Sequence, residues 1–516
     1  MSDSKSVTSV CARSLNSVHA GFLVSAVLLI VLAIGLRAYN IGHPSLWNDE
    51  LFSRYYADLF GLKYLWTTGL SREDSPPLYY MALAGWMRLF GTSEAAMRSL
   101  SMVASVLALP LVYLIGKELF DRRRGLIAAL VMALSPLQIH FAQEARTYAL
   151  MLLPIGVALF AIARILNGDT RQRVLWLYGV GAIVALYCHA TAAFFVAACN
   201  VAVIIAILGD RRIDRRQALI RWIATNVIVG IAAIPELAAM ALQGRSGSGL
   251  EWIPRFGPLD VVRGLTPVLS GNATPVRFPG VELALLLLAF VAGALVVANP
   301  GRRAWIVLVA IPAIFVAMIA AASVFQPIFI VRVFCWLSMP LALLLAHALA
   351  TPWRLRPVLA GVAATACLVG LFYHFTVPQK EPWREVFQDV GHELVTARHV
   401  VLAPMTDPTG AAYYAPYLTR LQAWDTGLRG SVEHEDMPQR MGVQSITREQ
   451  LVSEIESGAD VWLVVGATAL PYVGSLLEDV PPPRVAVARS CAKALCVAVL
   501  SWTGNAPRAM TRAGTP

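Results

Sequence analysis

Long apolar segments follow one another through the first 376 residues of the 516-residue chain. A helix needs about 20 mostly apolar residues to cross the hydrocarbon core of a bilayer, and eleven segments come close to this length. They are residues 20–38, 99–119, 126–141, 148–166, 175–188, 190–208, 220–242, 281–298, 304–322, 333–350 and 358–375. The pattern predicts a polytopic α-helical membrane protein with about eleven transmembrane helices, the first of them an uncleaved anchor.

The composition excludes most other classes of protein. Hydrophobic residues make up 57% of the chain and charged residues 14%, against about 25% charged residues in a soluble domain. A soluble enzyme could not bury so much apolar surface, and a disordered or coiled-coil protein would carry more charge. The net charge of +10 does not indicate a nucleic-acid partner, because most arginines lie in short clusters between apolar segments.

These arginine clusters orient the chain. If residues 77–90 are not counted as a span, every cluster falls on one side of the membrane. The clusters are Arg122–Arg124, Arg164 with Arg171 and Arg173, Arg211–Arg212 with Arg215–Arg216, Arg302–Arg303, and Arg354 with Arg356. Since basic residues stay in the cytoplasm, the N-terminus is predicted to be cytoplasmic. Residues 77–90 alone could form a short span, but a span there would put Arg122–Arg124 outside, so an amphipathic helix in the membrane interface fits better.

This orientation places two large segments on the outer side. The first is the loop 39–98, and the second is the tail 377–516, in which acidic residues return. Residues 399–403, 460–466 and 485–488 of the tail have the pattern of strands, and a capping box at 447–450 begins a helix that runs to about 457. We expect the tail to be a small extracytoplasmic α/β domain, and residues 1–376 to form the membrane domain.

The first outer loop carries two adjacent acids, Asp49 and Glu50, between apolar side chains. Apolar flanks reduce the solvation of a carboxylate and increase its proton affinity, which suits a general base. Two solvated loop acids are the plainer alternative. The same loop offers further polar candidates for substrate binding, which are Arg54, Asp74, Tyr79 and Tyr80.

Other outer loops add candidates at the membrane surface. An acid or an arginine at this depth is costly unless it is paired or functional, and arginine matches the geometry of a lipid phosphate. The candidates are Glu144, Arg146, Tyr148, His189, Arg255 and Arg332. Each has an ordinary alternative: a structural ion pair for Glu144 and Arg146, a hydrogen-bonded interfacial histidine for His189, and headgroup anchoring for the arginines.

Three sequence strings carry a resemblance to a known family. They are WNDELFSRYYA at 47–57, SPPLYYMALAGWMRLFGTSEAAMRSLS at 75–101 and LSPLQIHFAQEARTYALMLL at 134–153. In order and spacing they resemble the dolichyl-phosphate-mannose–protein mannosyltransferase-like glycosyltransferases, a family with bacterial relatives that include the aminoarabinose lipid A transferases. The resemblance covers about the first 200 residues, continues loosely to Arg332, and is nearly absent from the tail.

The resemblance implies the GT-C fold and an enzyme that transfers a hexosyl or pentosyl group. The donor would be a polyprenyl-phosphate-linked sugar and the acceptor a lipid, a glycan or a protein, on the outer side of a bacterial inner membrane. Asp49 would be the general base, Glu50 would support it, and Glu144 would stand where the family often has a second acid. Many bacterial members have a histidine before the double proline, where this chain has Asp74 and Ser75, so a metal-binding or acceptor-binding role of that position does not carry over.

Simple chemistry completes the expectation. A lipid phosphate leaves as an anion, so it needs positive charge nearby more than an acid, and Arg146, Arg255 or Arg332 could supply that charge. The acceptor needs a base in line with the anomeric carbon, and direct displacement would invert that carbon.

A divalent metal is possible but is not required by the sequence. A transporter or lipid flippase is the main alternative, although no internal repeat is visible; a scaffold protein with a sensing tail is another.

Two cysteines close to the C-terminus predict a disulfide. Cys491 and Cys496 lie in the tail, which the orientation places where disulfides persist. The flanking residues read as two strands joined by a short turn, and a four-residue loop would set the two cysteines opposite each other, within the distance that a disulfide needs. Two unpaired buried thiols are the alternative.

Overall fold

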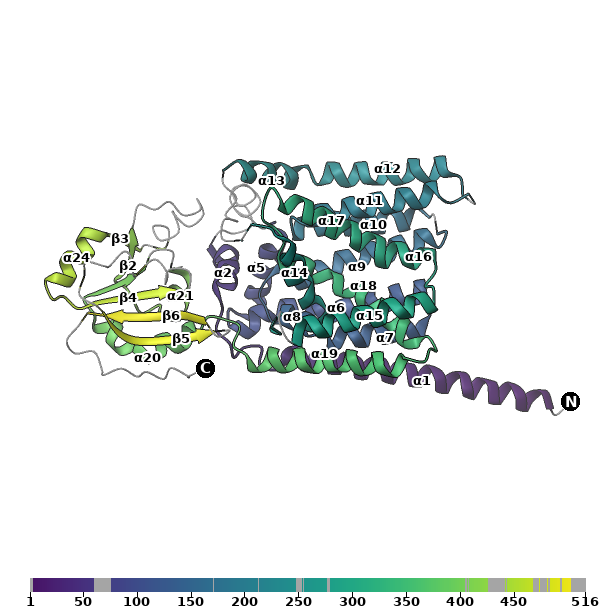
Figure 1. The fold of residues 1–516 in the computed structure, drawn as a ribbon, viewed down its shortest axis with the longest axis horizontal. Coiled ribbons are helices and arrows are strands. Elements are labelled where there is room, and N and C mark those ends of the chain that lie inside the picture. Colours follow the sequence, from purple (N-terminus) through teal and green to yellow (C-terminus); the bar gives the residue numbers. More distant parts are fainter. Residues whose placement is uncertain are drawn as a thin grey trace.

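A computed structural model describes residues 3–59, 76–169, 171–211, 213–246, 253, 255–275, 279–403, 406, 408–425, 441, 443–466, 473, 480, 483–491 and 494–502. It consists of a bundle of long helices with a sheet at one end, and two short helices, α2 and α5, lie between the bundle and the sheet (Figure 1). The N-terminal end of α1 lies at the opposite end of the bundle from the sheet (Figure 1).

The bundle contains helices over each of the predicted apolar segments and, in addition, α14, which the apolar pattern did not predict. They are α1 (Asp3–Ala38), α6 (Glu94–Leu119), α7 (Arg122–Leu134), α8 (Pro136–Ala142), α9 (Thr147–Leu166), α10 (Gln172–Cys188), α11 (Ala192–Leu208), α12 (Arg215–Ala232), α13 (Ile234–Ser246), α14 (Pro258–Ser270), α15 (Val281–Val297), α16 (Arg302–Trp305), the π-helix η3 (Ile306–Ala310), α17 (Ile311–Ser323), the 3₁₀ helix η4 (Val331–Leu337), α18 (Ser338–Ala350) and α19 (Arg356–Thr376). Among the described residues, six helical segments are long and apolar enough to cross a membrane, or seven if one bent pair counts as a span. The polytopic helical fold is therefore confirmed, whereas the number eleven stays a prediction.

The predicted segment 126–141 is broken into two helices. α7 and α8 meet at an angle of 61°, and the break falls at Ser135, which has an extended conformation (ψ 118°) before Pro136. Proline disfavours a helical conformation of the residue before it and is well accommodated at the first position of a new helix. Gly370 of α19 lies so close to α8 that an added Cβ would approach Pro136 Cγ to 2.5 Å.

The first outer loop contributes two short helices. α2 (Asn48–Leu59) begins directly at the Asp49–Glu50 pair, and α5 (Leu78–Phe90) follows the double proline as expected. One face of α5 is buried, including Tyr79, Leu83 and Met87. The helix predicted at 77–90 is thus present, and it is not among the candidate spans.

The tail forms one six-stranded sheet with the order β3-β2-β1-β4-β6-β5. Its elements are α20 (Trp383–Thr396), β1 (His399–Leu402), α21 (Pro408–Tyr414), β2 (Leu421–Asp425), β3 (Gln444–Thr447), α24 (Arg448–Glu456), β4 (Val461–Gly466), β5 (Arg484–Cys491) and β6 (Ala494–Ser501). The first four strands in that order are parallel, and β6 is antiparallel to both of its neighbours. The three predicted strands and the capping box that begins α24 are confirmed.

The hairpin that carries the two tail cysteines differs from the expectation. The register pairs Cys491 with Ala494, so the connection is shorter than the four-residue loop that would place Cys491 opposite Cys496. The side chains of both cysteines lie outside the described residues, and the disulfide stays a proposal that mass spectrometry of the non-reduced tail would test.

The sheet and the first outer loop share one hydrophobic core. Leu46, Leu51 and Tyr79 of the loop belong to the same buried cluster as Trp383 of α20 and Val464 of β4. Since apolar burial of this kind is the main stabilising contribution in a folded protein, the tail is packed onto the loop that carries Asp49.

Candidate active site

Asp49 lies in the first turn of α2 and is held by two arginines from distant parts of the chain. Its Oδ2 accepts a hydrogen bond from Arg332 Nη1 at 2.5 Å and lies 3.6 Å from Arg146 Nη2. The Asp49 side chain is 25% exposed, whereas the side chains of Arg146 and Arg332 are 13% and 18% exposed. The carboxylate is therefore accessible, and two guanidinium groups lie directly beside it.

The two arginines are held by neighbours of different kinds. Arg146 Nη1 donates to the Asp49 carbonyl oxygen at 3.1 Å and to Ser53 Oγ at 3.2 Å, and Arg332 Nη1 donates to the Tyr148 hydroxyl oxygen at 3.4 Å. Burial alone would lower the pKa of Arg146, but the charge of Asp49 and the nearby tyrosines raise the pKa well above its usual value. Both guanidinium groups thus stay charged, and both lie beside the Asp49 carboxylate.

His189 lies near Arg146 and Arg332, and its ring is neutral. Burial, followed by the charges of Arg146 and Arg332, lowers the pKa of His189 to about 3. The backbone N–H of Thr191 donates to His189 Nδ1 at 3.2 Å. Because a backbone N–H can only donate, Nδ1 carries no proton, and the proton of the neutral ring is assigned to Nε2. The ring lies against that of Tyr148, with the centroids 5.7 Å apart.

Two buried polar atoms lie beside Asp49. Trp47 Nε1 and Asn48 Oδ1 have no hydrogen-bond partner within the described part of the chain. Buried polar groups are normally paired, and an orphaned one calls for an explanation such as a missing ligand. Trp47 Nε1 is a donor and Asn48 Oδ1 is an acceptor, a combination that suits a ligand with hydroxyl groups.

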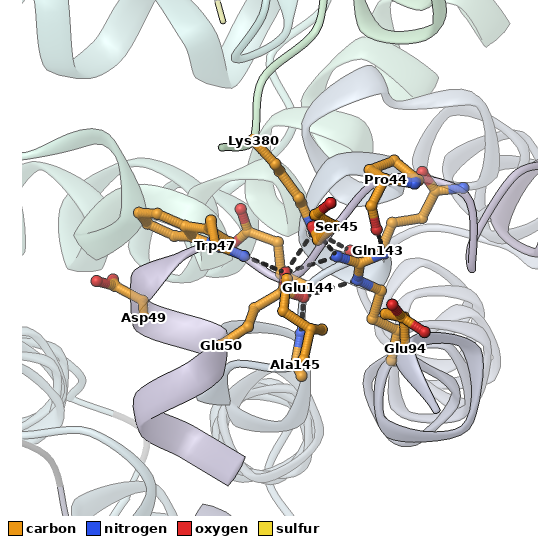
Figure 2. Close-up of polar contacts among 12 residues, drawn as sticks. Pro44, Ser45, Trp47, Asp49, Glu50, Glu94, Gln143, Glu144, Ala145 and Lys380 are labelled. Carbon is orange, nitrogen blue, oxygen red and sulfur yellow. Dashed lines mark hydrogen bonds and ion pairs between the residues drawn. The ribbon is translucent and has the colours of Figure 1, made fainter. Parts of the chain in front are cut away.

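Glu50 has the opposite environment from its neighbour. Its side chain is fully buried and accepts two hydrogen bonds from Arg98, at 2.8 Å from Nε and 2.7 Å from Nη2. Lys380 Nζ donates to it at 3.0 Å and the backbone N–H of Ala145 at 2.8 Å. In Figure 2 Asp49 points away from this cluster, while Glu50 points into it. Glu50 therefore links α2 to the segments that carry Arg98, Ala145 and Lys380. Its side chain is buried, unlike that of Asp49.

The Glu144 carboxylate pairs with neither Arg146 nor Arg332. Its side chain is buried, and Oε1 lies 3.2 Å from His140 Nε2. His140 in turn contacts Asn272 Nδ2 at 2.9 Å. The Glu144 carboxylate thus lies beside a histidine and does not pair with Arg146, and its role stays a prediction.

The remaining predicted residues fall into four separate positions. Tyr79 and Tyr80 are buried in the same hydrophobic cluster as Leu51 of α2. Arg54 faces the tail, where its guanidinium lies over the Tyr413 ring at 4.8 Å from the centroid, so it is not directed at Asp49. Arg255 is exposed, and among the described residues the cations that contact Asp49 are Arg146 and Arg332. Asp74 lies outside the described residues.

Two residues of the site were not predicted. Arg98 stands within one of the family-like strings but carries no signal of its own, because an arginine in a helix usually faces solvent. Lys380 has a weak signal: it is a basic residue directly after the last span on the side where basic residues are few.

No group of three or more His, Cys, Asp or Glu side chains in the described part of the chain is placed to hold a metal ion.

Comparison with known proteins gives one family match and several structural matches. Residues 74–237 match the family model for dolichyl-phosphate-mannose-protein mannosyltransferase. No curated protein sequence matches the chain. The structure is similar to ArnT from Cupriavidus metallidurans bound to undecaprenyl phosphate (TM-score 0.59, 14% identity), covering 93% of this chain and 98% of ArnT, and to the apo state of the same protein (TM-score 0.59, 14% identity, 94% and 98% covered).

A more distant match is the oligosaccharyltransferase of Archaeoglobus fulgidus in its apo form. The TM-score is 0.51 at 13% identity, and the match covers 86% of this chain and 69% of that one. Identities at this level establish the fold and not the substrate. Residues 74–237 are thus similar to the dolichyl-phosphate-mannose-protein mannosyltransferase family, and the chain has the same fold as ArnT.

Proposed function

We propose that the protein is a membrane glycosyltransferase that moves a sugar from a polyprenyl-phosphate donor to a lipid, glycan or protein acceptor. The observation that carries the proposal is the cluster of Asp49, Arg146 and Arg332, in which an accessible carboxylate and two cations meet. The fold match to a protein whose structure contains undecaprenyl phosphate supports a lipid-linked donor of the same kind.

The arginines bind the phosphate of the donor. A guanidinium presents a planar fork of N–H donors that fits phosphate oxygens, and it keeps its charge at any pH of interest. As the bond between sugar and phosphate breaks, negative charge grows on the bridging oxygen, and two fixed cations in a partly buried site stabilise that charge. His189 is neutral and adds no charge, so it serves as a hydrogen-bond donor through Nε2.

Asp49 accepts the proton of the attacking acceptor group. A hydroxyl or amine becomes a better nucleophile as a positioned base removes its proton, which typically contributes 10²–10⁴-fold to the rate. The oxygen or nitrogen of the acceptor then bonds to the anomeric carbon as the phosphate leaves from the opposite face, so the product has the inverted configuration. Trp47 Nε1 and Asn48 Oδ1 are suited to bind hydroxyls of the sugar.

The site lies on the outer side of the membrane in this proposal. The chain crosses a bacterial inner membrane eleven times with a cytoplasmic N-terminus, α5 lies in the interface, and the sheet is an extracytoplasmic domain. The placement of the N-terminal end of α1 at the opposite end of the bundle from the sheet supports this arrangement (Figure 1), as does the alternation of the arginine clusters.

The test separates an enzyme from a transporter or flippase of lipid-linked substrates. Purified protein in detergent is incubated with a radiolabelled polyprenyl-phosphate sugar and a membrane-envelope acceptor fraction. An enzyme releases free carrier phosphate and produces labelled acceptor without any membrane to cross. A transporter leaves the donor intact in detergent, and intact donor after long incubation with acceptors of all three classes would refute the proposed transfer.

A further inference from the structure

The segment that joins the last membrane helix to the tail returns into the outer loops. Lys380 lies four residues after α19 ends, and its side chain is only 9% exposed. Its Nζ donates to Glu50 Oε2 at 3.0 Å and to the carbonyl oxygen of Gln143 at 2.7 Å. Figure 2 shows Lys380 reaching into the cluster from a separate stretch of chain. One ammonium group therefore connects α2 with the loop between α8 and α9.

These two acceptors belong to the segments that carry the proposed chemistry. Glu50 follows Asp49 directly in α2, and Gln143 begins the short loop that ends at Arg146. The same loop is also tied to α2 by the Ala145 N–H, which donates to Glu50 Oε1. The position of Arg146 relative to Asp49 thus depends on these contacts, to which Lys380 contributes two hydrogen bonds, together with the direct bonds from Arg146 to α2.

The charges around Glu50 stabilise these contacts. Burial alone would raise the pKa of Glu50, but the charges of Arg98 and Lys380 lower it to about 2. Burial, together with the charge of Arg98, lowers the pKa of Lys380 to about 8. A buried charge without its partner is strongly unfavourable, so the carboxylate holds both cations in place.

Further contacts join the tail to the segment before α2. Tyr414 of α21 accepts a hydrogen bond from the Leu46 N–H at 2.6 Å and donates to Glu94 at 3.0 Å. Arg384 of α20 donates to the carbonyl oxygen of His43 and forms an ion pair with Glu94. These contacts hold the outer loop against α6, but they do not reach the loop that ends at Arg146.

We propose that Lys380 is a positioning residue through which the tail fixes Asp49 relative to Arg146. It touches neither of these two residues and acts through Glu50 and Gln143. This inference rests on the proposed function, and it adds that the tail is part of the catalytic apparatus. The competing assignment, in which Lys380 binds the donor phosphate directly, predicts a different kinetic effect.

The experiment compares Lys380→Met with Arg398→Met in the full-length protein. Methionine has a similar length without the charge, and Glu50 keeps its pair with Arg98, so the variant should fold. Arg398 is a matched control, because it is a tail cation with a 66% exposed side chain that lies 4.0 Å from Glu454. Displacements of about 1 Å at a reacting centre reduce rates by up to about 10²-fold.

We expect Lys380→Met to lower kcat at least about tenfold while the KM for the donor stays within about twofold, and Arg398→Met to change neither. Hydrogen exchange, which needs no turnover, should accelerate in peptides covering 48–53 and 143–147 of Lys380→Met. An unchanged kcat, or a raised donor KM with normal kcat, would overturn the inference. If the wild type shows no transfer at all, the proposed function fails, while the exchange result still tests the contacts of Lys380.

Discussion

At the scale of single residues, the two adjacent acids have different environments. Successive residues on a helix point about 100° apart, so when one of them is buried the other can stay accessible. Glu50 is enclosed by Arg98, Lys380 and the Ala145 N–H, whereas Asp49 faces Arg146 and Arg332. The sequence predicted an acidic pair with catalytic importance. It could not tell which acid would be buried, because that depends on residues 48 and 330 positions away in the chain.

The pairing of Glu50 makes stability depend on pH in a defined direction. Its pKa in the folded protein is about 2, against 4.5 for an ordinary glutamate. A lowered carboxyl pKa contributes stability that is fully present above about pH 4.5 and is lost as the pH falls toward 2. We expect Glu50→Gln to be less thermally stable than the wild type at pH 7, with a difference that shrinks between pH 4.5 and pH 3. Thermal unfolding in detergent measures this, and a difference that does not change with pH would contradict the pairing.

Arg332 is expected to act on the donor more than on the acceptor. A charge-assisted hydrogen bond contributes about 1.5–3 kcal/mol, which corresponds to about 10- to 100-fold in binding. Arg332→Ala should therefore raise the KM for the polyprenyl-phosphate donor at least about tenfold and change the acceptor KM little. Arg263→Ala is a suitable control, because Arg263 is a mostly exposed arginine that pairs within its own helix. If the donor KM of Arg332→Ala is normal, Arg146 becomes the better candidate for phosphate binding.

At the scale of elements, local sequence signals were reliable where they were strong. The double proline and the apolar pattern after it predicted α5, and the capping box predicted α24. The Ser135–Pro136 step that breaks α7 from α8 was hidden within a continuous apolar run. Strands β2 and β3 were missed, because each is short and has a mixed polar pattern that does not alternate clearly.

The predicted interfacial position of α5 can be tested by labelling. Thr92 is exposed just beyond the C-terminal end of α5, and the proposed orientation puts it on the outer side. In a background with Cys491→Ser and Cys496→Ser, Thr92→Cys should react with an impermeant thiol reagent in intact cells. Arg123→Cys, in the first turn of α7, should react only after permeabilisation. The reverse pattern would make α5 a span and refute the eleven-helix arrangement.

At the scale of the whole molecule, the tail and the outer loop form one structure. The sequence predicted both segments and their common side of the membrane. It did not predict that Leu46 and Trp383 would belong to one core, or that Lys380 would pair with Glu50. Such contacts join residues hundreds of positions apart, and composition and periodicity report only local structure and burial. The long-range packing of the site had to come from the fold.

The central claim is that Asp49 and its two arginines form a site of sugar transfer, and the most direct measurement is the rate of carrier-phosphate release by Asp49→Asn. Asp58→Asn is the matched control, because Asp58 lies in the same helix, pairs with Arg54 and has a side chain that is 51% exposed. Both variants should be present in the membrane at normal levels. Asp49→Asn should lose at least about 10²-fold in rate, while Asp58→Asn should keep the wild-type rate. A loss of less than about tenfold in Asp49→Asn would contradict the assignment of Asp49 as the base.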